Sequence, residues 1–168
     1  MPCNWRNGAA RVIATVSSSF KAEQARLAGA DLVIDYKTED VIAKTMAFTE
    51  QRGVNRVVDV NFGGNIATTL KLMAMNSTIA VYATNGNRNP VLPVRELMGK
   101  CIALRTLILF ALPPALLAAA QADITKWLAA APRLHNIAAQ FPLSETAQAH
   151  LAVEKGDKLG TVIVDCAR

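Results

Sequence analysis

The sequence is poor in charged and in aromatic residues. Only 18% of its 168 residues are charged and 5% are aromatic, whereas 52% are hydrophobic. A soluble domain usually has roughly a quarter of its residues charged. Lysine and arginine exceed aspartate and glutamate by five, but the basic residues are scattered and form no run of like charges. With so few aromatic rings for base stacking, these features predict no nucleic-acid binding and some apolar surface that a partner covers.

Cysteine is scarce as well. Cys3, Cys101 and Cys166 are far apart, and no two of them form a Cys-x-x-Cys pair. This spacing argues against a disulfide framework and against a zinc site, and it fits a reducing cytoplasm. The N-terminus has no apolar signal segment, and the longest apolar stretch, 107–120, is interrupted by two prolines and too short to span a bilayer. We therefore expect a cytoplasmic protein that neither crosses a membrane nor binds a metal.

What the sequence does contain is an alternation of strand-like and helix-like segments. Helix signals separate the strand-like runs, such as the three serines after the first run and the helix-ending Gly29. Such an alternation predicts right-handed crossovers and a mostly parallel sheet with helices on both faces, so the fold class is α/β and Rossmann-like. The β-branched runs predict strands at 11–16, 32–35, 56–60, 77–82 and 102–109.

The pattern changes at Pro113. An alanine-rich helix follows, and after it come a further helix and a last strand at 161–164. We therefore expect two parts. Residues 1–131 form a dinucleotide-binding domain, and residues 132–168 form a return segment that packs on another body.

Candidate binding residues follow the ends of the predicted strands, where open parallel sheets hold their ligands. An NAD site usually has an Asp or Glu at the end of the second Rossmann strand, the place that follows 11–16 here, and its carboxylate accepts hydrogen bonds from ribose hydroxyls and repels a 2′-phosphate. After the first strand this chain has serines and a lysine instead, which suit a phosphate. The alternative is that the serines only cap a helix and that Lys21 is solvated. The candidates are Ser17, Ser18, Lys21, Tyr36, Asn61, Phe62, Gly63, Ala83, Thr84 and Asn85.

Five stretches of the sequence also carry a resemblance to a known family. They are RVIATVSSSFKAEQARLAGAD, LVIDYKTED, RVVDVNFGGN, STIAVYATNG and the closing LGTVIVD. In this order they resemble the zinc-free NADPH:quinone oxidoreductase branch of the medium-chain dehydrogenase/reductase superfamily, from about Arg11 to Asp165. The resemblance implies an enzyme that transfers a hydride from NADPH to a quinone or an enone.

The resemblance assigns roles to several of the candidates. It implies that Lys21 and Tyr36 hold the 2′-phosphate, with a small residue at Ser17 or Ser18, and hence that the cofactor is NADPH and not NADH. These four residues are the basis of the cofactor prediction.

Other candidates are placed by the resemblance along the rest of the cofactor. Residues 61–64 and 83–85 would lie along the ribose and the nicotinamide. Ile108 and Phe110 would approach the nicotinamide from the next strand. For Phe62 and Phe110, packing in the core is an equally good interpretation.

No catalytic residue is expected in this chain. In hydride transfer the cofactor carries the chemistry, and the protein binds and orients it. His135 and His150 are the only histidines, and each stands in a helical or loop context that is more typical of surface or packing positions. We assign neither a role.

The chain lacks the glycine-rich turn, G-x-G-x-x-G, that holds a pyrophosphate at a helix N-terminus. In the family this turn follows a first strand, and a catalytic domain precedes both, so we expect the chain to begin after the first helix of the fold. In the strand order 3-2-1-4-5-6 the missing strand is the central one. Strands 11–16 and 56–60 are then left with unpaired edges, and either they pair with each other or another chain fills the space.

Two other functions remain open. The chain could be a non-catalytic oligomerisation module, because in dimers of the family the strand matching 102–109 pairs with its twin across a two-fold axis. We therefore expect a homodimer through 102–109, which is compatible with cofactor binding. A different nucleotide-binding α/β domain is the third option, and the combination of serine, lysine and tyrosine argues against it.

Overall fold

The computed structural model describes residues 10–84, 86–132, 135–156 and 158–167. Every pair of neighbouring strands in it is parallel, which confirms the α/β fold class and the predicted parallel strands. The elements in chain order are β1 (Ile13–Val16), α1 (Ser19–Leu27), β2 (Leu32–Asp35), α2 (Val41–Phe48), β3 (Val54–Asp59), α3 (Phe62–Leu72), β4 (Met73–Val81), α4 (Val94–Gly99), β5 (Ala103–Thr106), η1 (Leu109–Ala111), α5 (Pro114–Ala130), β6 (Ile137–Pro142), η2 (Leu143–Glu145), α6 (Thr146–Glu154) and β7 (Thr161–Asp165).

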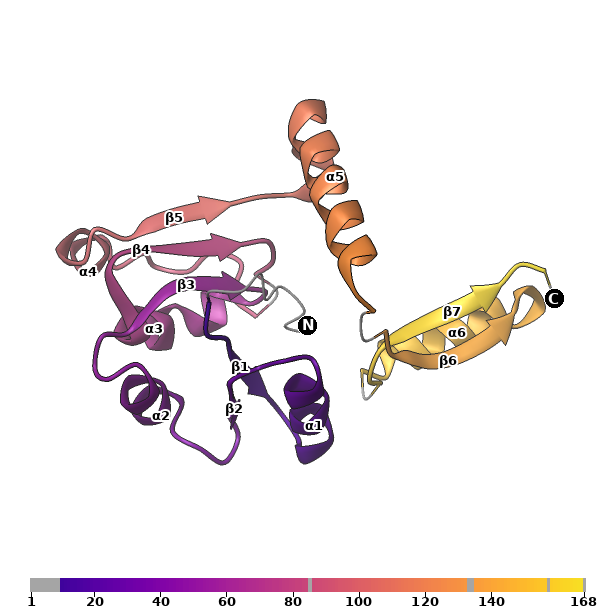
Figure 1. Ribbon diagram of the computed structural model, residues 1–168, viewed down its shortest axis with the longest axis horizontal. Coiled ribbons are helices and arrows are strands. Elements are labelled where there is room, and N and C mark those ends of the chain that lie inside the picture. The colour runs from indigo at the N-terminus through magenta and orange to yellow at the C-terminus, as the bar shows by residue number, and fades with distance from the viewer. Residues whose placement is uncertain (1–9, 85, 133–134, 157, 168) are drawn as a thin grey trace.

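The strands form three separate parallel sheets where the sequence predicted one (Figure 1). Strand β1 pairs with β2, strands β3, β4 and β5 pair in that order, and β6 pairs with β7. In the described part of the chain β1 and β3 do not pair with each other, so the first of the two outcomes expected for these edges does not occur.

Strand β5 is shorter than the predicted strand 102–109. It pairs with β4 only from Thr78 to Val81, and the amide of Leu107 donates to the Val81 carbonyl at 3.0 Å as the ladder ends. Because β4 stops at Val81, residues beyond 107 have no strand to pair with. The chain turns instead into η1 and then reaches the prolines that begin α5.

The main hydrophobic core lies between α3 and one face of the β3–β4–β5 sheet. Ile79 is fully buried, and Leu70 and Met73 are nearly so. Helix α3 is held at its C-terminal end by Lys100, whose ammonium donates to the carbonyls of Leu70 and Met73 at 2.7 and 2.8 Å. These bonds satisfy carbonyls that the end of a helix leaves without an amide partner. This part of the chain therefore carries its own core.

Helix α5 and the unit formed by β6, α6 and β7 lie outside the core between α3 and the β3–β4–β5 sheet. Helix α5 buries none of its residues and stands away from the β3–β4–β5 sheet (Figure 1). The β6–α6–β7 unit is tied to the first sheet by a hydrogen bond from Asn136 Nδ2 to Gln24 Oε1 on α1, at 2.9 Å. No helix in the described ranges combines the length and apolarity that crossing a membrane requires.

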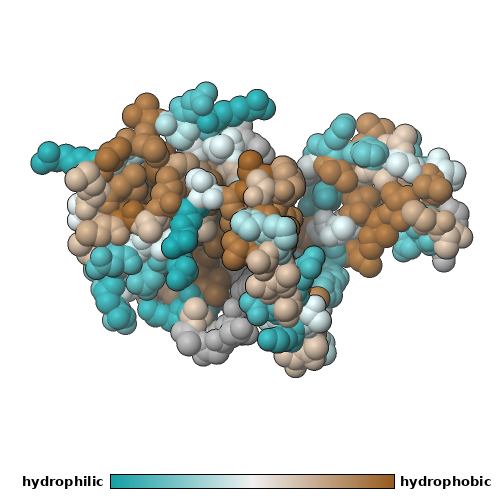
Figure 2. All heavy atoms as spheres, turned by 90° about the horizontal axis from the view of Figure 1, so that it is seen from above, coloured by the Kyte–Doolittle hydropathy of each residue, from teal (hydrophilic) through white to brown (hydrophobic). Residues whose placement is uncertain are grey.

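The chain exposes a large surface for its size. Its accessible area is 11657 Å², roughly 3,600 Å² more than a compact monomer of 18.0 kDa exposes. Figure 2 shows hydrophobic side chains at the surface over both the sheet region and the C-terminal unit. Large exposed apolar areas mark interaction surfaces, which agrees with the expectation that a partner covers part of this chain.

Candidate cofactor-binding site

The loop after β1 is organised by its serines and its lysine. Ser18 is extended, with φ −166° and ψ 159°, and its hydroxyl accepts from the amide of Lys21 at 3.4 Å as the N-cap of α1. The Lys21 ammonium turns back over the loop and donates to Ser17 Oγ at 3.2 Å. Ser18 is thus a helix cap, as the alternative interpretation expected, and the lysine is held at the end of the strand.

Tyr36 reaches the same loop because β1 and β2 are paired. Its amide donates to the carbonyl of Val16, the last residue of β1, at 3.0 Å. The Tyr36 side chain is 55% exposed, so its ring and hydroxyl are open to a ligand at this edge. Pairing in parallel register therefore brings together Ser17, Ser18, Lys21 and Tyr36 at the carboxyl ends of the two strands.

Two carboxylates near this loop have hydrogen-bond partners of their own. Asp35, which pairs with Val16 at the ends of the two strands, accepts from the Lys37 amide at 3.0 Å. Glu39 forms an ion pair with Lys44 and also accepts from the amide of Asp35 at 2.7 Å. The hydrogen bond from Lys44 lowers the pKa of Glu39, and the bond from Asp35 lowers it further. Among the described residues Lys21 forms no ion pair, so its positive charge is available to an anion.

The loops after β3 and β4 are tied together around Asn61. The Gly86 amide donates to Asn61 Oδ1 at 2.9 Å, and Asn61 and Thr84 form an antiparallel bridge. A Cβ on Gly64 would lie 2.5 Å from Asn61 Nδ2, and one on Gly86 would lie 2.8 Å from Asn61 Oδ1. Glycine at both positions lets the carboxamide sit between the two loops, because any side chain there would displace it.

Thr84 also joins the loops after β3 and β4. Its hydroxyl accepts from the Gly63 amide at 3.0 Å and donates to the Asn87 carbonyl at 2.7 Å. Phe62 is 6% exposed and belongs to the hydrophobic core, which leaves only its main chain for a ligand. The structure therefore brings Asn61, Gly63 and Thr84 together as one rigid edge. Ala83 lies within it, and Asn85 lies outside the described residues.

A buried carboxylate that the sequence analysis did not single out lies beneath this edge. Asp59, the last residue of β3, is 4% exposed, and its Oδ1 accepts from the Asn61 amide at 2.8 Å and from Asn65 Nδ2 at 3.0 Å. Its Oδ2 is buried and has no hydrogen-bond partner among the described residues. A buried acceptor without a donor is costly, so this atom marks a place where a donor is expected. The signal in the sequence was an acidic residue inside the β-branched run Val57–Val60.

Tyr82 lies next to this carboxylate. Its amide donates to the Asp59 carbonyl at 3.3 Å. Burial raises the pKa of the Tyr82 phenol above its usual 10.0, and the negative charge of Asp59 raises it further. The phenol therefore remains protonated, and able to donate a hydrogen bond, to a higher pH than an exposed tyrosine.

In the described part of the chain, no hydrogen bond joins Ile108 or Phe110 to either group of loops. They follow β5, with Ile108 56% and Phe110 91% exposed. Phe110 is therefore not a core residue. Their approach to a nicotinamide stays a prediction.

A zinc site is not formed by the residues that the structure describes. They contain no group of three or more His, Cys, Asp or Glu side chains placed to hold a metal. Cys101 and Cys166 are both exposed, and neither has the neighbours that a tetrahedral zinc site needs.

Solved structures share this fold. A 2-haloacrylate reductase is 25% identical with a TM-score of 0.80, and the match covers 92% of this chain and 49% of that one. The Escherichia coli quinone oxidoreductase, solved in complex with NADPH, is 21% identical with a TM-score of 0.77 over 93% of this chain and 50% of that one. An NAD-dependent alcohol dehydrogenase is 22% identical with a TM-score of 0.78 over 93% and 44%. The chain thus spans about half the length of the structures it matches.

The sequence itself matches a family model. No curated protein is similar enough in sequence to count as a match. The model described as zinc-binding dehydrogenase matches residues 5–123, which is more than half of the chain. This match and the shared fold confirm the resemblance at the level of the medium-chain dehydrogenase/reductase superfamily. The chain belongs to the zinc-binding dehydrogenase family and corresponds to the C-terminal, cofactor-binding portion of a medium-chain dehydrogenase/reductase.

Proposed function

We propose that this chain is the cofactor-binding part of a zinc-free, cytoplasmic oxidoreductase that uses NADPH to reduce a quinone or an enone. The observation that carries the proposal is the arrangement of Lys21, whose ammonium lies at the end of β1 with a serine hydroxyl beside it and no carboxylate partner among the described residues. A 2′-phosphate needs such cations and hydroxyl donors. An NAD-specific site instead has an acid at this edge.

The residues of the site bind and orient in this proposal, and none transfers a proton. Lys21 and Tyr36 hold the adenosine end, and the rigid edge formed by Asn61, Gly63 and Thr84 supports the ribose and nicotinamide end. Asp59 Oδ2 would accept a hydrogen bond from a donor that reaches the buried end of β3. When bound, the reduced nicotinamide supplies the hydride. Residues 132–168 pack, in this proposal, on the catalytic domain of the complete enzyme.

A titration of NADPH and NADH against the unchanged chain and against Lys21→Ala tests the cofactor proposal. A charge-assisted hydrogen bond contributes about 1.5 to 3 kcal/mol, so Lys21→Ala should weaken NADPH binding roughly ten- to a hundredfold. It should leave NADH almost unchanged, because NADH has no 2′-phosphate. Tyr36→Phe should weaken NADPH less, since it removes one neutral hydroxyl.

Lys37→Ala is the matched control, because Lys37 is an exposed lysine one residue beyond Tyr36. It should change neither affinity by as much as Lys21→Ala. Absolute affinities are expected to be poor, since both cofactors lose the glycine-rich turn that binds the pyrophosphate. Equal binding of NADH and NADPH by the unchanged chain would mean that the serines and the lysine only cap α1.

A second function, homodimerisation through residues 102–109, is supported by the segment that follows β5. Strand β5 lies at the edge of its sheet, and Leu107, Ile108 and Leu109 expose 40%, 56% and 64% of their surfaces. Free edge amides and carbonyls beside apolar side chains invite pairing with a second copy.

Light scattering of the unchanged chain and of Leu107→Lys tests this proposal. The charged side chain would have to be buried in a twin interface, so the variant should dissociate at concentrations where the unchanged chain is a dimer. Lys126→Ala, on exposed α5, should leave the dimer intact. A monomer at every concentration for the unchanged chain would contradict dimerisation.

A further inference from the structure

The turn after β2 places acidic side chains on both sides of Tyr36. Asp35 is the last residue of β2 and directly precedes Tyr36, and Glu39 follows three residues after it. Like charges repel one another, so carboxylates in this turn oppose the binding of a phosphate beside Tyr36. The charge of these acids has to be offset if the turn is to accept an anion.

Glu39 fixes the main chain of this turn. Its Oε2 accepts from the Asp35 amide at 2.7 Å. The Asp35 carbonyl in turn accepts from the amides of Thr38 and Glu39 at 3.1 and 2.9 Å, while the Tyr36 amide donates to the Val16 carbonyl on β1 at 3.0 Å. The backbone of Tyr36 is thus held on one side by β1 and on the other by the closed turn, and its exposed ring is carried on a fixed support.

Lys44, on α2, supplies the charge that offsets Glu39. Its ammonium pairs with Glu39 Oε1, so each oxygen of the carboxylate has a separate partner. The side chain of Glu39 is 29% exposed and that of Lys44 is 48% exposed, so the pair is only partly open to water. The hydrogen bond from Lys44 is the largest of the effects that lower the pKa of Glu39. Arg26, on α1, contributes least to this shift and pairs with Glu23 at 3.5 Å.

The other acids of the turn are compensated by main-chain amides. Asp40 is the N-cap of α2, and its Oδ1 accepts from the amides of Ile42 and Ala43 at 2.9 and 3.0 Å, where the positive end of the helix also favours its charge. Asp35 Oδ1 accepts from the Lys37 amide at 3.0 Å. Of the described acids at 35–40, Glu39 is therefore the one whose charge is offset by a side-chain cation.

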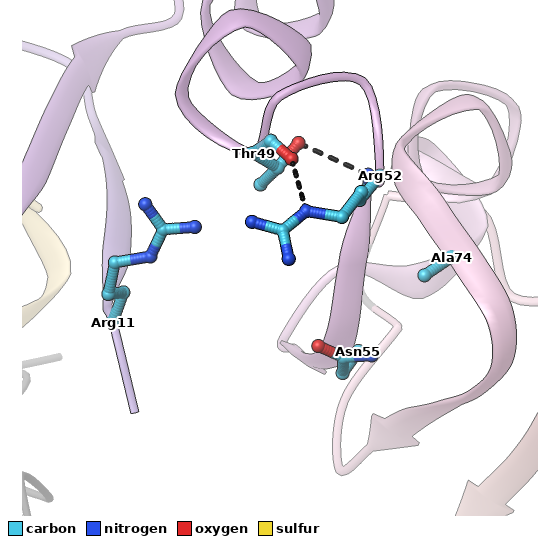
Figure 3. Close-up of a pocket in the computed structure, with 6 residues that line it drawn as sticks. Arg11, Thr49, Arg52, Asn55 and Ala74 are labelled. Atoms are coloured by element: carbon cyan, nitrogen blue, oxygen red, sulfur yellow. Dashed lines mark hydrogen bonds between the residues drawn. The ribbon is translucent and has the colours of Figure 1, made fainter. Parts of the chain in front are cut away.

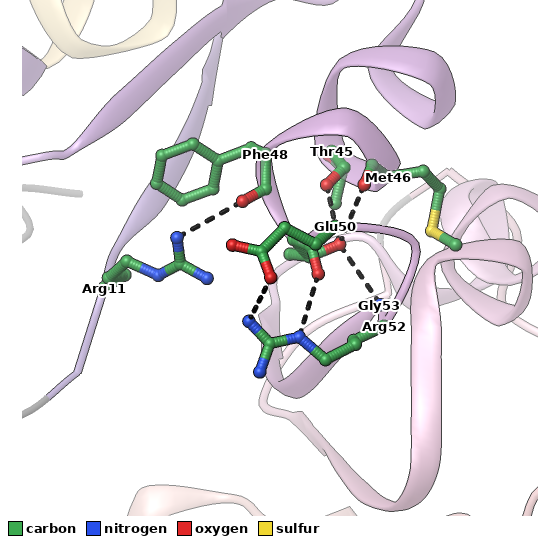
Figure 4. Close-up of polar contacts among 8 residues, drawn as sticks. Arg11, Thr45, Met46, Phe48, Glu50, Arg52 and Gly53 are labelled. Carbon is green, nitrogen blue, oxygen red and sulfur yellow. Dashed lines mark hydrogen bonds and ion pairs between the residues drawn. The ribbon is translucent and has the colours of Figure 1, made fainter.

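The arginines next to β1 and β3 lie at the opposite ends of the strands. Figure 3 shows the guanidinium groups of Arg11 and Arg52 pointing toward each other across a cavity of about 180 Å³. Arg11, which precedes β1, donates to the Phe48 carbonyl at 3.2 Å, and Arg52, which precedes β3, donates to the Thr49 carbonyl at 3.3 Å (Figure 4). Both are bound at the amino ends of their strands, so neither takes the place of Lys44 beside Glu39.

We propose, on the basis of the NADPH preference proposed above, that Lys44 determines specificity through Glu39 by neutralising the carboxylate that positions Tyr36, so that a 2′-phosphate can bind beside this turn. Glu39 is the positioning residue, because its Oε2 holds the main chain that carries Tyr36. Lys44 does not touch the ligand in this arrangement. A nucleotide with a free 2′-hydroxyl has no charge at this place and gains little from the neutralisation.

Two nucleotides that differ only in the 2′-phosphate test the proposal. Adenosine 2′,5′-bisphosphate and AMP are titrated calorimetrically against the full chain, against Lys44→Gln and against Glu39→Gln, and the ratio of their affinities is compared. Lys44→Gln leaves the Glu39 charge unpaired and should weaken the bisphosphate about threefold relative to AMP. Glu39→Gln keeps an oxygen for the Asp35 amide and leaves Lys44 unpaired, so it should strengthen the bisphosphate about threefold relative to AMP.

The double variant and a remote cation are the controls. Glu39→Gln combined with Lys44→Gln removes both charges and should return the affinity ratio to within about twofold of that of the unchanged chain. Lys71→Gln, at an exposed cation on α3, removes the same charge as Lys44→Gln and should leave the ratio unchanged. In high salt the differences between the variants should shrink, because exposed charges are screened. Circular dichroism checks that each variant is folded, and if Lys44→Gln does not fold, the direction of the Glu39→Gln effect decides.

The outcomes separate this role of Lys44 from the cofactor preference itself. Equal binding of the two nucleotides by the unchanged chain would overturn the NADPH proposal and the role of Lys44 with it. A preference for the bisphosphate that Lys44→Gln leaves intact would overturn the role of Lys44 alone. If Glu39→Gln weakens the bisphosphate as Lys44→Gln does, the ion pair only stabilises the turn and the proposal is wrong.

Discussion

The β3–β4–β5 sheet with α3 and the segment from Leu107 through α5 are both rich in apolar residues, yet they differ in what they bury. In the first region Ile79 is fully buried and Leu70 is 2% exposed. In the second, α5 has no buried residue and Phe110 is 91% exposed. Hydrophobic content alone therefore does not make a core, because side chains are buried only where a second element packs on them.

The largest expected difference between the two regions is in the free energy of unfolding that a substitution to alanine removes. Ile79→Ala removes a fully buried side chain from the middle of β4 and should lower the free energy of unfolding by about 2 to 5 kcal/mol. Leu128→Ala, at a position 43% exposed on α5, should change it by less than about 0.5 kcal/mol. Urea denaturation of both variants measures the contrast. Equal losses would mean that α5 packs on the rest of the chain in solution.

A smaller effect is expected when a hydrogen bond within the first region is compared with the hydrogen bond that joins the β6–α6–β7 unit to α1. Asn61→Ala removes the side-chain oxygen that accepts from the Gly86 amide and joins the two loops, and it should cost about 1 kcal/mol. Asn136→Ala removes a hydrogen bond to Gln24 on α1, at a contact where water can replace it. Its effect on global unfolding should be below about 0.5 kcal/mol. Chemical denaturation measures both, and the reverse order would show that the C-terminal unit contributes to the main core.

The smallest effect concerns alkaline pH. The folded state raises the pKa of Tyr82, first by burial and then by the charge of Asp59, so the folded chain holds the phenol proton more tightly than the unfolded chain. This stability is fully present below the unfolded pKa of about 10 and is lost as the pH rises through the folded pKa. Thermal unfolding followed from neutral to alkaline pH should therefore decline less for Tyr82→Phe.

The sequence was informative where structure depends on neighbours along the chain. The β-branched runs predicted strands β1 to β5, and Ser18 caps α1 as a serine in that position was expected to do. The length of β5 was not predictable in the same way. Its length depends on where β4 ends, and β4 is far away in the sequence. Periodicity reports which side chains share a face, but it does not report how long the paired strand is.

The candidate site divides along the same line. Lys21 and Tyr36 were identified from the sequence because both follow strands, and parallel strands end at one edge of a sheet. The buried Oδ2 of Asp59 and the position of the Asn61 side chain against Gly64 and Gly86 could not be identified in this way, because each depends on two loops lying in contact. Contacts between loops far apart in the sequence are determined by tertiary packing.

The α/β class, the parallel direction of the strands and the family could be predicted from the sequence, because each follows from local patterns repeated along the chain. The separation into three sheets, the exposure of α5 and the convergence of Arg11 and Arg52 on one cavity emerged only from the folded chain. Hydrogen-bonded edges and buried faces exist only between elements that pack on one another. Segments 41 residues apart, such as Arg11 and Arg52, meet only after the elements that carry them have packed.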